Sequence, residues 1–326
     1  MHALPEFTLQ RPGTLAEAAA LLAAEPGARL VAGGTDLLPN LRRGLERPRM
    51  LLDLSGLAGF DAVDDETDGG ATLGAGLTLA AIAADATLAA RWPALAEAAL
   101  AAAAPGHRSA ATLGGNLCQD TRCVFYNQSE WWRASNDYCL KRGGTVCHVA
   151  PTGERCHAAF SGDLAPVLLA LGAQVELQSA RGQRWLPLAQ LYRDDGAAHL
   201  TLAPDELLSR VRLPAPRAGA VCGYRKARVR GAIDFPLAAV AVALALEGGR
   251  IASLAIALSG TNSHPLLLAG THELAGLPVD DALVARVGKL VAQQVSPMRS
   301  TATPSNYRRQ VATALVQRLL RELAVG

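Results

Sequence analysis

Apolar positions along this chain follow two spacings, and each spacing predicts a different kind of element. Apolar residues at helical spacing predict helices over residues 18–25, 37–43, 79–104 with an interruption at Pro93, 164–171, 281–294 and 305–323. Shorter apolar runs between turn residues predict strands over residues 28–32, 173–178, 183–188, 237–247 and 250–259. Between Met50 and Ala75, short apolar runs separated by Asp and Gly indicate antiparallel strands.

The first fifty residues read as a small α/β unit. Thr14-Leu15-Ala16-Glu17 is a capping box, in which the Thr hydroxyl and the Glu carboxylate each accept a free backbone N–H. Pro26-Gly27 ends that helix, and the strand over 28–32 leads into Gly33-Gly34-Thr35-Asp36. A glycine turn is therefore expected at the carboxyl end of a strand.

The chain changes composition at Leu213-Pro214-Ala215-Pro216, which predicts a boundary between domains 1–216 and 217–326. In the second part, Gly248-Gly249 joins two apolar runs and is typical of a hairpin. The last helix places Val311, Leu315, Leu319 and Leu323 on one stripe, which we interpret as core.

Composition narrows the possible functions. The net charge is +2 and half of the residues are apolar, so the chain is expected to be globular, with no basic stripe for nucleic acid. The longest apolar run, 237–246, is far shorter than the roughly 20 residues of a membrane span. The first residues do not resemble a signal peptide. We expect a cytoplasmic protein, in which clustered cysteines more often bind metal than form disulfides.

Two Gly-Gly segments are candidates for binding an anionic ligand. They are Leu30, Val31, Ala32, Gly33, Gly34, Thr35, Asp36 and Leu37, and Thr112, Leu113, Gly114, Gly115 and Asn116. Consecutive backbone N–H groups in such turns suit a pyrophosphate, and two loops can hold the phosphates of a dinucleotide from opposite sides. The alternative is an ordinary tight turn with Asp36 as a helix cap. Neither segment matches a Rossmann or Walker pattern.

Four of the six cysteines, Cys123, Cys139, Cys147 and Cys156, gather behind the second loop in a segment rich in aromatic residues. The intervals between them are fifteen, seven and eight residues, without the close Cys-x-x-Cys pair of most structural zinc sites. This spacing favours a loop around an iron–sulfur cluster over a zinc site, with free structural thiols as a third reading. Cys118 adjoins the glycine loop and is expected to face its ligand, and Cys222 is expected in the core.

The two glycine segments together resemble the phosphate loops of the FAD-binding subunit of molybdenum hydroxylases, the family of the xanthine and carbon monoxide dehydrogenase flavoproteins. Ser161-Gly162-Asp163-Leu164-Ala165-Pro166, Tyr224–Arg228 and Tyr307-Arg308-Arg309 fit the same family. The resemblance implies an α+β fold: a PCMH-type FAD-binding domain of two α/β subdomains with a cysteine-rich insertion, then a C-terminal α+β domain. It also implies FAD contacts from both glycine segments, Asp163 and Lys226.

The cysteine segment is similar to one found in a single branch of that family, the beta subunits of 4-hydroxybenzoyl-CoA reductase. The similarity lies in the runs 118–123 and 126–132. It implies that the insertion at about 118–158 carries one 4Fe-4S cluster, with Cys123, Cys139, Cys147 and Cys156 as ligands. It does not include Cys118 among the cluster ligands and assigns this residue to the loop that binds the flavin.

By this resemblance the chain is an electron-transfer subunit with no catalytic acid–base pair of its own. Its partners would be a molybdenum-cofactor subunit and a 2Fe-2S subunit in a heterotrimeric complex, with a low-potential donor such as ferredoxin. The complex would convert 4-hydroxybenzoyl-CoA to benzoyl-CoA in anaerobic aromatic degradation. The alternatives are the flavin subunit of another molybdenum hydroxylase and a zinc-stapled binding module without redox chemistry.

Overall fold

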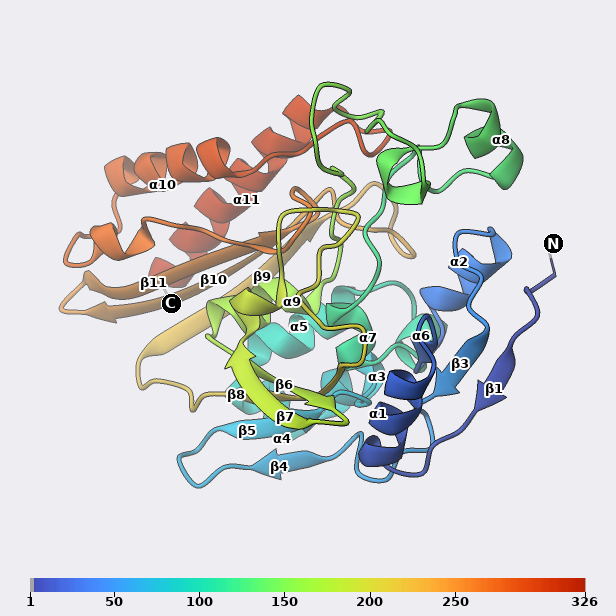
Figure 1. The fold of residues 1–326 in the computed structure, drawn as a ribbon. Helices are drawn as coiled ribbons and strands as arrows, with labels where there is room; N and C mark the ends of the chain where they lie inside the picture. Colours follow the sequence, from blue (N-terminus) through green and yellow to red (C-terminus); the bar gives the residue numbers. More distant parts are fainter. Residues whose placement is uncertain (1–2, 326) are drawn as a thin grey trace.

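The computed structural model describes residues 3–325, and across them the strands form three sheets (Figure 1). The first sheet contains β1 (Thr8–Gln10), β2 (Arg29–Val31) and β3 (Met50–Asp53) in the order β1-β3-β2. All its pairings are parallel, so the expectation of antiparallel strands is wrong for β3. The helices α1 (Leu15–Ala24) and α2 (Leu37–Arg42) follow β1 and β2, and such helical crossovers allow parallel pairing.

Helix α1 begins at the predicted capping box. The Thr14 hydroxyl accepts from the Glu17 N–H at 3.1 Å, and the Glu17 carboxylate accepts from the N–H of Gly13 at 2.8 Å. The helix ends at Ala24, just before Pro26 and Gly27. The capping pattern in the sequence therefore fixes where the chain leaves β1 and returns toward β2.

The second sheet is antiparallel, in the order β4-β5-β8-β6-β7. Its strands are β4 (Val63–Asp65), β5 (Ala71–Gly74), β6 (Gln174–Ser179), β7 (Gly182–Pro187) and β8 (Leu207–Leu213). Here the predicted antiparallel pairing is confirmed for β4 with β5 and for β6 with β7. The predicted boundary at residues 216 and 217 lies just after β8, in the connection to the third sheet.

Short helices pack beside this second sheet. They are α3 (Leu79–Ala84), α4 (Ala86–Arg91), α5 (Pro93–Ala101), α6 (Pro105–Arg108), α7 (Leu113–Leu117) and α9 (Leu164–Ala170). The predicted helical stretch 79–104 is interrupted at Pro93 as expected, and also at Asp85. The Asp85 carboxylate accepts from the N–H groups of Thr87 and Leu88 and starts α4. Every residue of α9 is buried, because this helix packs against α5 and α7 and also against the third sheet, described next.

The third sheet contains β9 (Ala220–Ala227), β10 (Ala238–Glu247), β11 (Arg250–Ser259) and β12 (Leu266–Leu267). Helices α10 (Asp281–Gln294) and α11 (Ser305–Val325) cover one face (Figure 1). In β10, Val240, Val242 and Leu244 pack toward these helices, while Ala239 and Ala241 belong to the core that includes α9. Small residues on alternate positions thus let α9 approach the sheet closely.

The cysteine segment projects from this framework between α7 and α9 (Figure 1). At its base Arg122 and Ala159 form an antiparallel bridge, with both N–H···O=C distances at 2.8 Å. The segment includes α8 (Glu130–Ser135) and the short helix η1 (Leu140–Arg142), and it has a small apolar core of its own. The fully buried Arg133 side chain donates to the carbonyl oxygen of Gln128 within the segment and to that of Arg43 at the end of α2, which ties the segment to the first α/β unit.

None of the helices within residues 3–325 is both long enough and apolar enough to cross a membrane.

A candidate dinucleotide site and a cysteine-lined cavity

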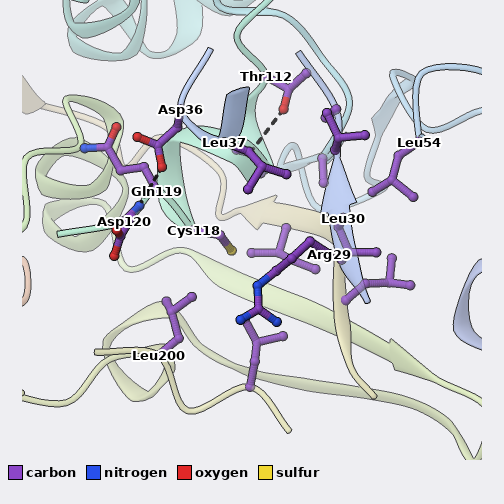
Figure 2. Close-up of a pocket in the computed structure, with 18 of the residues that line it drawn as sticks. Arg29, Leu30, Asp36, Leu37, Leu54, Thr112, Cys118, Gln119, Asp120 and Leu200 are labelled. Carbon is purple, nitrogen blue, oxygen red and sulfur yellow. Dashed lines mark hydrogen bonds between the residues drawn. The ribbon is translucent and has the colours of Figure 1, made fainter. Parts of the chain in front are cut away.

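A cavity of about 510 Å³ lies between the two glycine loops and the segment 197–208. All eight residues of the first loop, Leu30 to Leu37, line it. Of the second loop, Thr112, Gly114, Gly115 and Asn116 line it, whereas Leu113 is fully buried away from it. Figure 2 shows Thr112 and Leu37 on one side of this space and Leu200 across from them. The structure therefore brings the two predicted loops to one cavity.

The first loop approaches the cavity as bare main chain. Gly34 has φ of +67°, which favours glycine. At Gly33 a side chain has no room, because the carbonyl oxygen of Ala110 occupies the position that a Cβ would need. In the second loop, the Thr112 hydroxyl caps α7 by accepting from the Gly115 N–H at 3.1 Å. Loops that present backbone suit a pyrophosphate, which is bound largely by main-chain N–H groups.

Asp36 does not cap α2, so that alternative reading of the first loop is wrong. Its carboxylate instead accepts the Asp120 N–H at 2.9 Å and forms an ion pair with Arg122. Arg122 also donates to the Asn40 side chain at 2.8 Å. Burial raises the pKa of Asp36, and the Arg122 guanidinium opposes that rise. These bonds tie the first loop to the start of the cysteine segment (Figure 2).

Sequence reasoning missed part of the cavity wall. Gln119, Asp120 and His199 line it, and Cys118 does so as expected. The buried side-chain nitrogen of Gln119 has no hydrogen-bond partner among the described residues, which leaves a donor for a ligand. Gln119 and Asp120 lie only a few residues after the second glycine loop in the sequence. This proximity could have identified them as residues of the cavity wall. Residues 197–208 contain no motif that would have identified them as part of a binding site.

His199 faces the cavity as a neutral ring. One ring nitrogen lies 3.0 Å from the Gln119 carbonyl oxygen, so that nitrogen carries the proton and donates. Burial, with the nearby Lys141 charge, lowers the pKa of His199 to about 4. The cavity therefore has no imidazolium charge at neutral pH.

Asp163 and Lys226 lie together but outside the cavity lining. Lys226 Nζ also donates to the carbonyl oxygen of Ala101 at 3.2 Å, and the Tyr224 hydroxyl donates to Asp163 at 2.7 Å. Burial raises the pKa of Asp163, and Lys226 opposes the rise. The two residues thus form one cluster with Tyr224, separate from the glycine loops. Their predicted contact with the ligand stays a prediction.

The four clustered cysteines surround a second, small cavity. Cys123, Cys139, Cys147 and Cys156 all line it, together with Phe125, Tyr126, Leu140, Lys141, His148, Val149 and Ala158. Each cysteine is buried and none is in a disulfide. The Ala158 N–H donates to the Cys156 sulfur at 3.4 Å. Thiols separated by long stretches of sequence therefore meet in one place.

The chemistry of this second cavity is that of buried thiols. Burial raises the pKa of Cys123 and raises that of Cys156 to about 12, and the other thiolates in the cavity add to both rises. Within residues 3–325, no three His, Cys, Asp or Glu side chains converge so that they could hold a metal ion. The four sulfurs therefore line a shared cavity but do not converge on the position of a single metal ion. His107, His148 and His157 lie in or near the cysteine segment in sequence, and of these three only His148 lines the cavity.

Comparison with known proteins matches nearly the whole chain to one family. Residues 5–216 match the FAD binding domain in molybdopterin dehydrogenase, and residues 223–323 match the CO dehydrogenase flavoprotein C-terminal domain. The FAD-binding subunit PaoB of aldehyde oxidoreductase from Escherichia coli (strain K12) is 36% identical over 76% of this chain and 80% of its own length. The carbon monoxide dehydrogenase medium chain of Afipia carboxidovorans is 27% identical over 96% of this chain and 94% of its own.

Solved structures agree with the sequence matches. Reconstituted CO dehydrogenase from Oligotropha carboxidovorans superposes with a TM-score of 0.82 at 25% identity, covering 99% of both chains. The expected α+β fold of this flavoprotein type is therefore confirmed. The chain belongs to the family of FAD-binding medium subunits of molybdenum hydroxylases.

Proposed function

We propose that this chain is an electron-transfer subunit that binds FAD in the large cavity and one 4Fe-4S cluster in the cysteine-lined cavity. As the family resemblance implies, we assign the substrate's chemistry to another chain of the complex. FAD supplies the ability to exchange one or two electrons, and the surrounding protein tunes it. Cytoplasmic localisation and the division into domains 1–216 and 217–326 remain part of this proposal.

The residues of the large cavity fit FAD. The main chain of the Leu30–Leu37 and Thr112–Asn116 loops would hold the pyrophosphate, with the unpartnered Gln119 amide as a further donor. The cluster of Asp163, Lys226 and Tyr224 lies outside the cavity lining, and its proposed contact with FAD is carried by the family resemblance. Flavin content after purification tests this assignment: about one FAD per chain is expected, and its absence contradicts it.

The observation that carries the cluster proposal is the shared cavity of Cys123, Cys139, Cys147 and Cys156. Four thiolates spread around an apolar space suit a cubane, whereas a structural zinc ion needs sulfurs about 2.3 Å from a single point. Ligation to iron takes place through thiolates, so assembly of the cluster would release the protons of these four thiols. Metal and acid-labile sulfide analysis of the anaerobically purified complex tests the point. About four irons and four sulfides per chain are expected beyond those of the 2Fe-2S subunit, and zinc in this chain without that additional sulfide refutes the cluster.

The complex proposed for this chain contains a molybdenum-cofactor subunit and a 2Fe-2S subunit. The support is that its relatives are named as medium chains or FAD-binding subunits, which implies larger assemblies around them. Co-purification of three chains with molybdenum, iron and flavin is the expected result. We also propose that a low-potential donor such as ferredoxin exchanges electrons with the cluster. The test is to mix ferredoxin with the complex and to measure whether the ferredoxin is oxidised or reduced.

Two reactions are candidates for the assembled complex. The resemblance of the cysteine segment favours reductive dehydroxylation of 4-hydroxybenzoyl-CoA to benzoyl-CoA. The relative with 36% identity is named as an aldehyde oxidoreductase subunit, which favours oxidation of an aldehyde instead. Assays of the complex with 4-hydroxybenzoyl-CoA under reducing conditions, and with aromatic aldehydes and an electron acceptor, separate the two. Purine or CO turnover alone would contradict both.

A further inference from the structure

Lys141 lies between the two cavities and belongs to the wall of the cysteine-lined one. Its side chain is only 6% exposed. Within the described residues it is the one lysine or arginine that lines this cavity. Its ammonium lies 4.4 Å from the centre of the Tyr126 ring, which lines the same cavity as the four cysteines.

Asp120 holds this ammonium from the other side. Lys141 Nζ lies 2.5 Å from Oδ1 of Asp120 and donates also to the Thr121 carbonyl at 3.1 Å and to the Thr121 hydroxyl. Its three protons are thus all used, and it meets the cysteines through its charge alone. Asp120 lines the large cavity. The Asp120–Lys141 pair therefore spans the wall between the two cavities.

We propose that Lys141, held by Asp120, is a positioning residue that sets the reduction potential of an iron–sulfur group bound by the four cysteines. This inference rests on the proposed function, because it needs a cluster in that cavity. Reduction adds one electron, and four thiolates already give the group a net negative charge. A buried cation beside it favours the reduced form and raises the potential, because the low-dielectric surroundings screen the charge weakly. The Asp120 carboxylate offsets part of this effect.

The test is an EPR-monitored redox titration of the complete complex with dithionite, combined with iron, sulfide and FAD analysis. Lys141→Met removes the charge and keeps the length of the side chain, so the midpoint potential of the cluster falls. Asp120→Asn leaves the ammonium uncompensated, so the midpoint rises. Lys141→Arg keeps the charge, and its midpoint stays closer to the wild-type value than that of Lys141→Met. Lys289→Met, on the exposed face of α10, is the control and leaves the midpoint unchanged.

Opposite shifts in Lys141→Met and Asp120→Asn, with iron and sulfide retained, support the proposal. Unchanged midpoints in both variants, or shifts of the same sign, overturn it. If Lys141→Met assembles without the 4Fe-4S cluster, the direction of the Asp120→Asn shift decides: a rise supports the proposal, and no change or a fall overturns it. Wild-type complex with no iron and sulfide beyond those of the 2Fe-2S subunit would refute the cluster itself, and this result is distinct from a failure of the Lys141 proposal.

Discussion

Lys226 Nζ lies 2.9 Å from Oδ1 of Asp163, and the two side chains are only 3% and 8% exposed. Removing one partner of such a pair leaves the other charge buried and unpaired. We expect Lys226→Met to lower the free energy of unfolding by about 3–5 kcal/mol, measured by urea denaturation.

The double variant Asp163→Asn with Lys226→Met is expected to recover much of that loss, since neither residue then carries a charge. Lys289→Met, at an exposed position, should leave the free energy of unfolding nearly unchanged. A loss in Lys226→Met no larger than in this control would contradict the assignment of a strongly coupled pair.

Gly33 is predicted to be indispensable for flavin binding. A Cβ on this residue would lie 1.8 Å from the carbonyl oxygen of Ala110, so Gly33→Ala must push the two loops apart. We expect FAD affinity to fall by about tenfold or more, equivalent to about 1.4 kcal/mol. The measurement is reconstitution of deflavinated protein with FAD, followed by flavin fluorescence.

Gly56→Ala is the matched control for that loop, because an added Cβ at Gly56 meets no atom within 4 Å. Its FAD affinity should equal that of the wild type. Equal affinities in both variants would show that the loops do not hold the cofactor.

Cys147→Ser is expected to abolish the 4Fe-4S contribution to the absorbance and EPR spectra while leaving FAD bound. The reason is that the cysteine cavity and the flavin cavity have separate linings. Iron, sulfide and flavin are measured on the same sample. Cys222→Ser serves as a comparison, since Cys222 packs against the main core and should not affect iron content. Simultaneous loss of iron and flavin in Cys147→Ser would mean that the segment maintains the flavin site.

His199 predicts a pH dependence of stability. Its pKa in the folded protein is about 4, below the ordinary value of 6.5, because burial disfavours the charged ring. The unfolded chain therefore binds this proton first as the pH falls. The contribution of the neutral ring is complete above about pH 6.5 and is lost between there and about pH 4, by at most about 3 kcal/mol.

The measurement compares urea unfolding of wild type and His199→Gln at several pH values. The wild type should lose more stability than the variant over this interval. Parallel pH profiles would show that His199 does not titrate differently in the folded and unfolded states.

The sequence predicted those parts of the fold that depend on local signals. The capping box at Thr14, the Gly248-Gly249 hairpin and the helix 281–294 appear where they were expected. It predicted the wrong pairing for β3, because short apolar runs separated by Asp and Gly occur in parallel strands as well. Strand partners depend on contacts distant in sequence, which local patterns do not contain.

The candidate sites, like the fold, could be predicted only where the sequence carries a distinctive local signal. The glycine loops and the four cysteines have distinctive residue types, and the structure brings each set to one cavity. The wall at residues 197–208 has ordinary composition, so nothing pointed to it. The sequence analysis did not single out Lys141, and only its burial between two cavities gives it a role.

The bridge between Arg122 and Ala159 has an evolutionary consequence. Because the two ends of the cysteine segment are hydrogen-bonded neighbours, a short connection could replace everything between them without moving α7 or α9. The proposed redox centre could therefore be acquired or discarded in one genetic step, by adding or deleting one continuous stretch of chain. Relatives with and without it would then share one flavoprotein body and differ only in how many electron carriers that body holds.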